Sequence, residues 1–312
     1  MLAVILRRLI SLPLVVVSVT FVTFIVGFLA PGDPILTLMG NQRDPVVYEN
    51  LRHLYGLDLP WYEQYWRYLQ GLIHGDLGMS YRYAQRAVTD LISSGVRVSL
   101  SLGGVALALS LLLGIPIGTY AAFHHNAWGE RLTMVPMLAL FAIPSFVLIP
   151  ILQWTNYQVY LRGWPSLPAA GWGSLQYWVM PVLVLAAGNL GYFSRLTRAN
   201  VLDVLGQDYV RTARGKGLPE TMVRTTHVLR NAMLPIVTVI GPAIAFLVTG
   251  AFVVESLFSI PGVGFLSVQA VEQRDYPVIQ GTVVVLSLAV VLMNLMTDLV
   301  YSLLDPRVRL DA

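Results

Sequence analysis

The sequence predicts an all-α membrane protein with six transmembrane helices, and two observations carry this prediction. The first is composition: 56% of the 312 residues are hydrophobic and 12% are charged, with a mean hydropathy of +0.66, whereas a soluble domain carries about 25% charged residues. The second is length, because a helix needs about 20 mainly apolar residues to cross a bilayer. Six apolar runs qualify, at approximately residues 9–30, 98–123, 132–154, 177–194, 233–254 and 278–304.

The first run is expected to stay in the protein as a membrane helix. It follows Arg7 and Arg8, as the apolar part of a secretory signal would. However, it is too long for a signal sequence, and the stretch GFLAPGDP that ends it has no small-x-small cleavage pattern.

The distribution of arginine predicts that both termini face the cytoplasm. With six alternating spans and an inner N-terminus, twelve basic residues fall inside, and the short outer loops hold only Arg162 and Arg274. The expected parts are then a transmembrane helix (1–30), an unusually long extracytoplasmic segment (31–96), a five-helix core (97–305) with a basic cytoplasmic loop (195–233), and a cytoplasmic tail (306–312). The inner set comprises Arg7, Arg8, Arg131, seven residues between 195 and 230, Arg307 and Arg309.

The later runs contain many residues that bend helices. GIPIG, residues 114–118, also places two glycines four apart, which allows two helices to approach closely. Two interpretations stay open: ordinary packing of a membrane bundle, or irregular helices that line a pathway. The prolines concerned are Pro116, Pro136, Pro144, Pro150, Pro181 and Pro242.

Composition and spacing exclude several functions. The chain has no cysteine, so it forms no disulfide or thiolate metal site. Asp33, Asp58 and Asp76 lie in turn-like contexts, and no metal site is expected. No catalytic pair lies within the apolar runs, so the chain is not expected to be an enzyme. RGKG, residues 214–217, lacks the first glycine and the final serine or threonine of a phosphate-binding loop. The basic residues are separated by spans, which argues against nucleic-acid binding.

The basic loop is predicted to form two short helices around a glycine. The first runs roughly over residues 201–216 and stops at Gly217, where we expect a positive φ angle. The second begins near Pro219, with Glu220 favourably placed at its positive end, and finishes near Asn231. From physics alone the loop is either a solvated turn that contacts lipid phosphate or a docking element.

The sequence DYVRTARGKGL, followed by HVLRNAMLPIVT, resembles the cytoplasmic EAA loop of ABC importer permeases, in the form found in the dipeptide and oligopeptide (peptide/nickel) transport family. Arg211, Thr212 and Ala213 occupy the Glu-Ala-Ala positions, followed by Gly217 and then Leu-Pro at 234–235. The arginine in place of glutamate and the longer spacing are both typical of the peptide subgroup. Five further stretches resemble the same family in order: PGDP, YGLDLPWYEQYWRYLQG, HGDLGMS, VVESLFSIPGVG and RDYPVIQG.

The resemblance, which extends from residue 1 to about 309, implies a type I ABC importer permease of the first-subunit type in a bacterial or archaeal cell membrane. Its implied partners are a second homologous permease, two ATP-binding subunits that carry ATP and Mg, an extracytoplasmic substrate-binding protein and membrane lipid; this chain itself would hold no cofactor. The loop would act as a coupling helix in a cleft of an ATP-binding subunit. The residues implied for coupling are Arg211, Thr212, Ala213, Arg214, Lys216, Gly217, Leu218, Pro219 and Glu220.

Residues near the outer side and within the spans are candidates for a gate or a translocation path. Glu255 lies at the outer end of the fifth run, where it either holds a gate or is simply a helix-end carboxylate. The following Pro261, Gly262 and Gly264 predict a compact bend. Asn189 and Asn294 are polar residues within spans.

Pro60 is predicted to open an amphipathic helix in the outer segment. Trp61, Tyr65, Tyr68 and Leu72 share one face of this helix. It either lies on the membrane surface or forms a lid or a platform for the binding protein.

The leading hypothesis is the permease of an ATP-driven importer for short peptides, with nickel and glutathione importers as alternatives within the family. A self-contained secondary transporter or channel is the alternative outside it. Such a protein needs ionisable residues deep in the spans, and this sequence keeps them near the ends.

Overall fold

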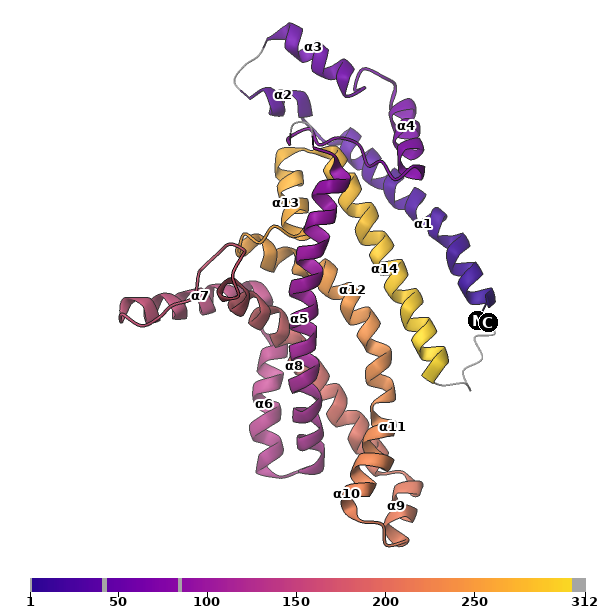
Figure 1. The fold of residues 1–312 in the computed structure, drawn as a ribbon, viewed down its shortest axis with the longest axis vertical. Coiled ribbons are helices and arrows are strands. Elements are labelled where there is room, and N and C mark those ends of the chain that lie inside the picture. The colour runs from indigo at the N-terminus through magenta and orange to yellow at the C-terminus, as the bar shows by residue number, and fades with distance from the viewer. Residues whose placement is uncertain (1, 41–43, 84–85, 305–312) are drawn as a thin grey trace. The chain divides into compact units, whose positions relative to one another are not determined.

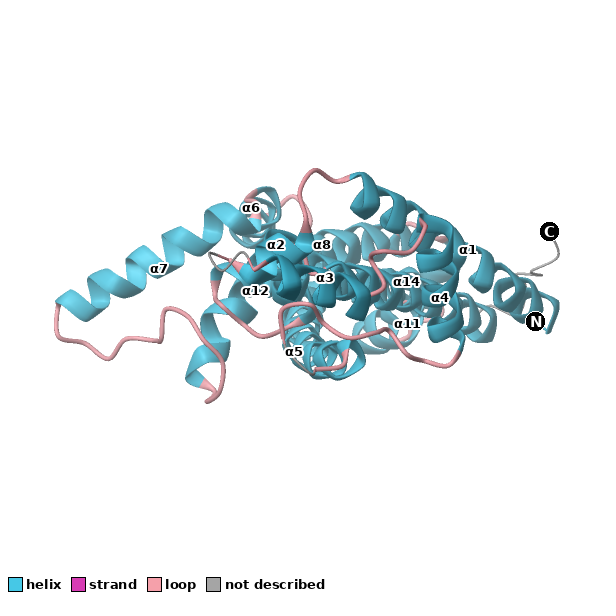
Figure 2. Ribbon diagram, turned by 90° about the horizontal axis from the view of Figure 1, so that it is seen from above, coloured by secondary structure: helices cyan, strands magenta, loops and turns pink. Residues whose placement is uncertain are grey.

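The computed structural model describes residues 2–40, 44–83 and 86–304, and the regular secondary structure in this part of the chain is helical apart from one isolated antiparallel bridge between Met79 and Ala87. Figure 2 shows it as helices joined by loops. The chain divides into two compact units. One contains residues 2–99 and 260–292, and the other contains residues 100–259 and the described residues from 293 onward. Helices α5 (Val88–Phe123) and α14 (Tyr276–Leu304) contribute to both units.

The unit formed by residues 2–99 and 260–292 combines α1 with the outer segment. Its remaining helices are short, and two of them begin at aspartates that accept a hydrogen bond from the backbone two residues later: Asp33 caps α2 and Asp44 caps α3. The turn-forming role expected of Asp33 is therefore confirmed. The helices are α1 (Leu2–Leu29), α2 (Pro34–Met39), α3 (Pro45–Leu54), α4 (Trp61–Ile73), the first part of α5, α13 (Val263–Gln273) and the first part of α14.

The amphipathic helix expected after Pro60 is present as α4, and one side of it packs on α1. The Tyr65 hydroxyl lies 3.0 Å from the Val17 carbonyl oxygen and 3.1 Å from the Thr20 hydroxyl, and its ring lies against those of Phe21 and Phe24. Part of its aromatic surface is thus used within the protein rather than at a membrane surface.

A buried carboxylate joins the outer segment to the start of α14. Asp275 accepts hydrogen bonds from the Ser80 hydroxyl and from the backbone N–H groups of Tyr81 and Arg82. Next to it, Arg274 has a left-handed backbone conformation and donates to the carbonyl oxygen of Pro31. RDYP, one of the stretches that resembled the permease family, therefore holds two parts of the outer segment in place.

The unit built from residues 100–259 and 293 onward is a bundle around α8 (Gln176–Leu205). The close approach predicted from GIPIG is confirmed: Gly114 and Gly118 of α5 lie directly against the backbone of α8 at residues 190–198. Gly191 of α8 lies in the same way against Met137 and Phe141 of α6. The other helices are α6 (Trp128–Ala142), α7 (Ser145–Leu161), α9 (Asp208–Gly215), α10 (Glu220–Met222), a π-helix η1 (Val223–Leu229), α11 (Arg230–Ala232) and α12 (Leu234–Leu257); Figure 1 labels the α-helices.

In the part of the chain that the structure describes, four helices are long and apolar enough to cross a membrane as single elements, and six spans result only if each of two bent helix pairs is counted as one. The expected third span is broken, because α6 and α7 meet at 107°. Pro144 stands at the break and disfavours a helical conformation at Ile143, which is extended. The fourth is longer than expected, since α8 continues to Leu205. The expected fifth span, at residues 233–254, begins after a 42° bend between the helical segments 220–232 and 234–244.

Candidate coupling site

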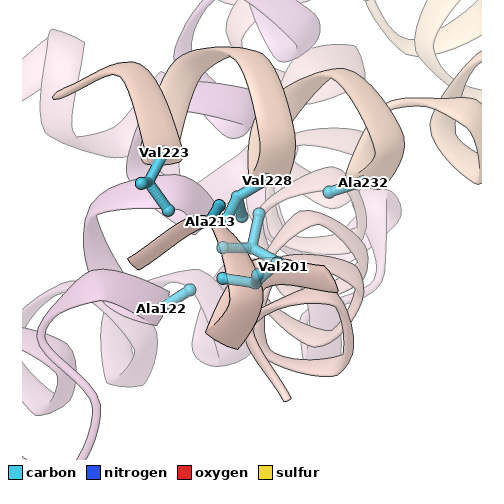
Figure 3. Packing of buried hydrophobic residues seen from close by; sticks show 7 residues of the cluster. Ala122, Val201, Ala213, Val223, Val228 and Ala232 are labelled. Atoms are coloured by element: carbon cyan, nitrogen blue, oxygen red, sulfur yellow. The ribbon is translucent and has the colours of Figure 1, made fainter. Parts of the chain in front are cut away.

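The basic loop folds into a compact element with its own core, here called the elbow (residues 208–232). Apolar side chains of α9, η1 and α11 meet at the ends of α5 and α8, as Figure 3 shows. Because these side chains are small and buried, the elbow is packed against the bundle instead of hanging from it as a solvated loop. The cluster comprises Ala122, Val201, Val210, Ala213, Val223, Val228 and Ala232.

The two-helix prediction for the elbow holds, with different boundaries. The first helix was expected over residues 201–216, but α8 ends at Leu205 and α9 begins only at Asp208. The chain turns at Gly206 and Gln207 between them, and Gln207 is extended. This turn brings Val210 and Ala213 back toward Val201, which one continuous helix would not allow.

Gly217 separates the two helical parts and has the positive φ angle predicted for it, +75°. A Cβ added at Gly217 would meet no heavy atom within 4 Å, so the glycine is needed for its backbone conformation and not for lack of space inside the chain. Pro219 precedes the second helix as its N-cap, and Glu220 occupies its first turn.

Glu220 organises the charges of the elbow. Its carboxylate accepts two hydrogen bonds from Arg214, at 2.8 and 3.1 Å, and one from Arg224 at 3.3 Å. The hydrogen bonds from Arg214, followed by the one from Arg224, lower the pKa of Glu220 below its ordinary value. Arg224 also lies over the ring of Phe123, 4.8 Å from its centre, so the charged network reaches the end of α5.

The residues implied for coupling separate into two groups. Ala213 is buried in the elbow core and presents no free surface to another chain, whereas Leu218 is partly buried and packs against that core. Arg214 is partly engaged by Glu220. The exposed basic residues are Arg211, whose side chain is 73% exposed and 3.6 Å from Asp208, and Lys216. The other exposed members of the set are Thr212, Gly217, Pro219 and Glu220.

The candidate gate residues lie in both units. Glu255 is fully buried near the end of α12. Pro261 and Gly262 form the bend predicted for them, and Gly262 is the N-cap of α13, in which Gly264 is buried. The backbone N–H of the next residue, Val263, donates to the Ser99 hydroxyl at 2.9 Å.

A cavity of about 460 Å³ lies beside α8 and is mostly apolar. Asn189 lines it together with Ser145 and Tyr192, but the Asn189 amide donates to the Leu185 carbonyl of its own helix at 3.0 Å. Asn294 is half-buried on α14. Sequence reasoning missed one nearby pair, Glu130 with Arg198, whose only signal was an acid just before an apolar run. Within the described residues, no group of three His, Asp or Glu side chains is arranged to hold a metal ion.

Together, the long apolar helices and the elbow define a helical membrane protein with the architecture of an ABC importer permease. The fold resembles the inward-facing MetNI methionine ABC transporter, with a TM-score of 0.58 and 17% identity over 69% of this chain and 96% of that chain. It also resembles an amino acid ABC transporter crystallised with histidines, with a TM-score of 0.52 and 18% identity over 70% and 95% of the two chains.

Two family profiles match the sequence. The binding-protein-dependent transport system inner membrane component matches residues 114–310, and the N-terminal part of such membrane components matches residues 1–102. The chain belongs to this family, and it is a permease of the first-subunit type found in peptide and nickel importers. It is similar to the glutathione transport system permease protein GsiC of Escherichia coli, 39% identical over 310 residues and 99% of both chains, and to GsiC of Shigella boydii, 38% identical over the same length and coverage.

Membership of this family defines the role of the chain in general terms. It is a non-catalytic, multi-pass inner membrane subunit of a bacterial ABC importer, and ATP is used by partner ATPase subunits. A second permease and a substrate-binding protein complete such a system. A self-contained transporter or channel is thereby excluded.

Proposed function

We propose that this chain forms, together with a second and similar permease, the translocation path of an importer for short peptides, and that the elbow transmits ATP-driven movement from an ATPase subunit. In this proposal α6 and α7 together form one span and α12 forms another, so the elbow residues 220–232 stay outside the membrane. This gives six spans and places both termini in the cytoplasm. The outer segment then faces the binding protein.

The compact, exposed elbow carries the coupling part of this proposal. Its core includes Ala122 of α5 and Val201 of α8, so a force applied to α9 or η1 acts directly on two long helices. Packed cores move as units and do not deform continuously. A push on the exposed surface around Arg211 and Lys216 would therefore displace the ends of α5 and α8 together.

The peptide substrate is supported by the family and by the relatives named for glutathione transport, since glutathione is itself a tripeptide. The test is ATP-dependent uptake into vesicles that contain the complete complex and its binding protein. Radiolabelled dipeptide, tripeptide, glutathione and a nickel chelate should be compared. Uptake of one or more peptides, with no uptake of the nickel chelate, is expected; transport of the nickel chelate alone would refute the peptide assignment.

We also propose that Glu255 and the bend at Pro261–Gly264 form part of an outer gate. Glu255 is completely buried, and a buried carboxylate is costly unless neighbouring groups compensate its charge. Its free energy therefore depends on those neighbouring groups, which supports a role in a gate that moves. Glu255→Gln should change the rate of transport or the ATP hydrolysis measured without substrate. Wild-type values for both rates would remove Glu255 from the gate.

A further inference from the structure

A larger cavity, of about 590 Å³, lies inside the outer segment. Residues of α2, α3 and α4 line it together with the end of α1, the start of α14 and neighbouring loops; Figure 1 shows these three short helices near the end of α1. All of the lining residues belong to the unit formed by residues 2–99 and 260–292. A cavity of this volume has room for a small molecule.

Aromatic side chains form much of the cavity wall. The ring centres of Tyr55 and Tyr81 are 4.5 Å apart. Burial raises the pKa of both hydroxyls, so they stay protonated. Rigid rings of this kind offer a large apolar surface to an apolar or planar group of a ligand. The wall also includes Phe24, Phe28, Tyr68 and Tyr276.

One hydroxyl in the wall lacks a partner. The hydroxyl of Tyr68, on α4, is buried and forms no hydrogen bond within the described part of the chain. Tyr65 of the same helix differs, because its hydroxyl contacts α1 at Val17 and Thr20. A buried hydroxyl without a partner is unfavourable. Since Tyr68 lines the cavity, a polar group of a ligand there would relieve this cost.

Charged groups of both signs line the same cavity. Asp33 accepts a hydrogen bond from the Tyr48 hydroxyl at 2.6 Å. This hydrogen bond is the main reason why the pKa of Tyr48 is raised, and the charge of Arg52 acts on the same hydroxyl in the opposite direction. Arg52 is only loosely paired, because its guanidinium lies 4.0 Å from Glu49, whereas Arg67 is held by an acid of its own helix at 2.9 Å. A carboxylate and a loosely paired guanidinium are thus neighbours of Tyr48.

We propose that this cavity holds the transported peptide on the outer side, before the peptide enters the translocation path; the inference rests on the peptide import proposed above. An apolar or aromatic side chain of the peptide packs on the rings. The Tyr68 hydroxyl donates to a peptide carbonyl oxygen. Arg52 binds the C-terminal carboxylate and Asp33 binds the amino terminus, as charge-assisted hydrogen bonds.

The same chemistry argues against other occupants. An acyl chain of a lipid would cover the rings but leave the Tyr68 hydroxyl unpaired, and Asp33 would repel a lipid phosphate. Inorganic phosphate would use Arg52 and leave the rings uncovered. A loop of the binding protein has neither a free carboxyl terminus nor a free amino terminus. A short peptide has all three chemical groups.

The first experiment measures peptide binding to the complete importer complex in nanodiscs, without its substrate-binding protein. Radiolabelled alanyl-phenylalanine is the probe, and alanyl-alanine is the comparison. We expect saturable binding of alanyl-phenylalanine. Alanyl-alanine should bind about tenfold more weakly, because a methyl group buries much less apolar surface than a phenyl ring.

Two variants test the polar contacts. Tyr68→Phe removes only the hydroxyl and should weaken binding of alanyl-phenylalanine about fivefold, the effect of one neutral hydrogen bond. Arg52→Gln should weaken it about tenfold, because a hydrogen bond between charged groups is stronger. Tyr62→Phe is the matched control, since Tyr62 lies on the same helix but is exposed and does not line the cavity. It should bind as the wild type does.

Thermal stability separates binding from a structural role. Without peptide, Tyr68→Phe should melt at the wild-type temperature or above it, because the variant loses an unpaired buried hydroxyl. A lower melting temperature would show that the hydroxyl stabilises the fold, and it would overturn the proposal. Unchanged peptide binding in both cavity variants would do the same.

A photoreactive peptide locates the site. Alanyl-azidophenylalanine should crosslink to residues 24–81 or 276–280, and crosslinks confined to the 460 Å³ cavity beside α8 would contradict the proposal. Peptide import with the binding protein, but no binding by the complex alone, would refute this cavity and leave the importer function intact. A complex that imports no peptide at all would refute the proposed function, and this inference with it. Phospholipid retained by the wild type and lost in Tyr68→Phe, without peptide binding, would assign the cavity to lipid.

Discussion

Replacing Gly217 tests whether the elbow contacts a partner. At this position the free-energy cost of a positive φ angle can be measured separately from the effect of a larger side chain. At a φ of +75°, any residue with a Cβ is strained, by about 1–2 kcal/mol. Since a Cβ at this position would meet no atom within 4 Å, alanine and leucine should carry the same backbone cost and no internal clash. Asparagine, which tolerates left-handed conformations, should cost less.

The three substitutions therefore form a graded series. Gly217→Ala and Gly217→Leu should both destabilise the isolated permease by about 1–2 kcal/mol, which lowers the denaturation midpoint equally. Gly217→Asn should lie closer to the wild type. None of them enters the elbow core, so membrane insertion should be normal for all three.

Only leucine is expected to disturb coupling strongly. Leucine adds bulk at an exposed position, on the surface where we propose that an ATPase subunit docks. The assay compares peptide uptake with ATP hydrolysis in vesicles that contain the complete complex. Gly217→Leu should hydrolyse ATP with little uptake, or lose its ATPase subunits, whereas Gly217→Ala should stay coupled. Equal coupling in the alanine and leucine variants would show that nothing docks at Gly217.

Three further predictions concern packing and topology. A Cβ at Gly118 would collide with the backbone of α8, so Gly118→Ala should destabilise the bundle by about 1–3 kcal/mol, whereas Gly104→Ala, on the same helix with open space around it, should not; equal thermal stability of both variants would contradict the packing described. Asp275→Ala removes the acceptor of three hydrogen bonds and should speed amide hydrogen exchange in residues 80–83, and unchanged exchange there would refute the role given to the carboxylate. Single cysteines placed at Ile73 and Gln207, both exposed, should react with a membrane-impermeant thiol reagent from opposite sides; labelling from the same side would contradict the six-span topology.

The parts of the fold that depend on local chemistry were predictable from the sequence. The positive φ of Gly217 followed from its place between two helical stretches, and the close approach of α5 to α8 followed from the spacing of Gly114 and Gly118. Because glycine lacks a Cβ, it is favoured where φ is positive or where two helices approach closely, so its positions in the sequence predict both features.

Features that depend on tertiary packing were not predictable. Hydropathy alone cannot show that a run of apolar residues is broken at Pro144, because prolines also occur within continuous membrane helices. The break after Leu205 arises because Val210 and Ala213 fold back on Val201, a contact between separate helices. For the same reason Ala213, predicted from family resemblance to meet a partner, instead fills the elbow core.

The most direct test of the elbow as the ATPase contact is site-specific crosslinking, which the absence of cysteine in this chain makes simple. A single cysteine in place of Lys216, on the exposed side of the elbow, would be treated with a short photoactivatable thiol crosslinker in membranes that contain the whole importer. A cysteine in place of Ile73 in the outer segment serves as the control. We predict a crosslink from position 216 to an ATPase subunit, with a yield that changes on addition of ATP, and none from position 73. Absence of the crosslink from position 216, in a complex that imports peptide normally, would contradict coupling through the elbow.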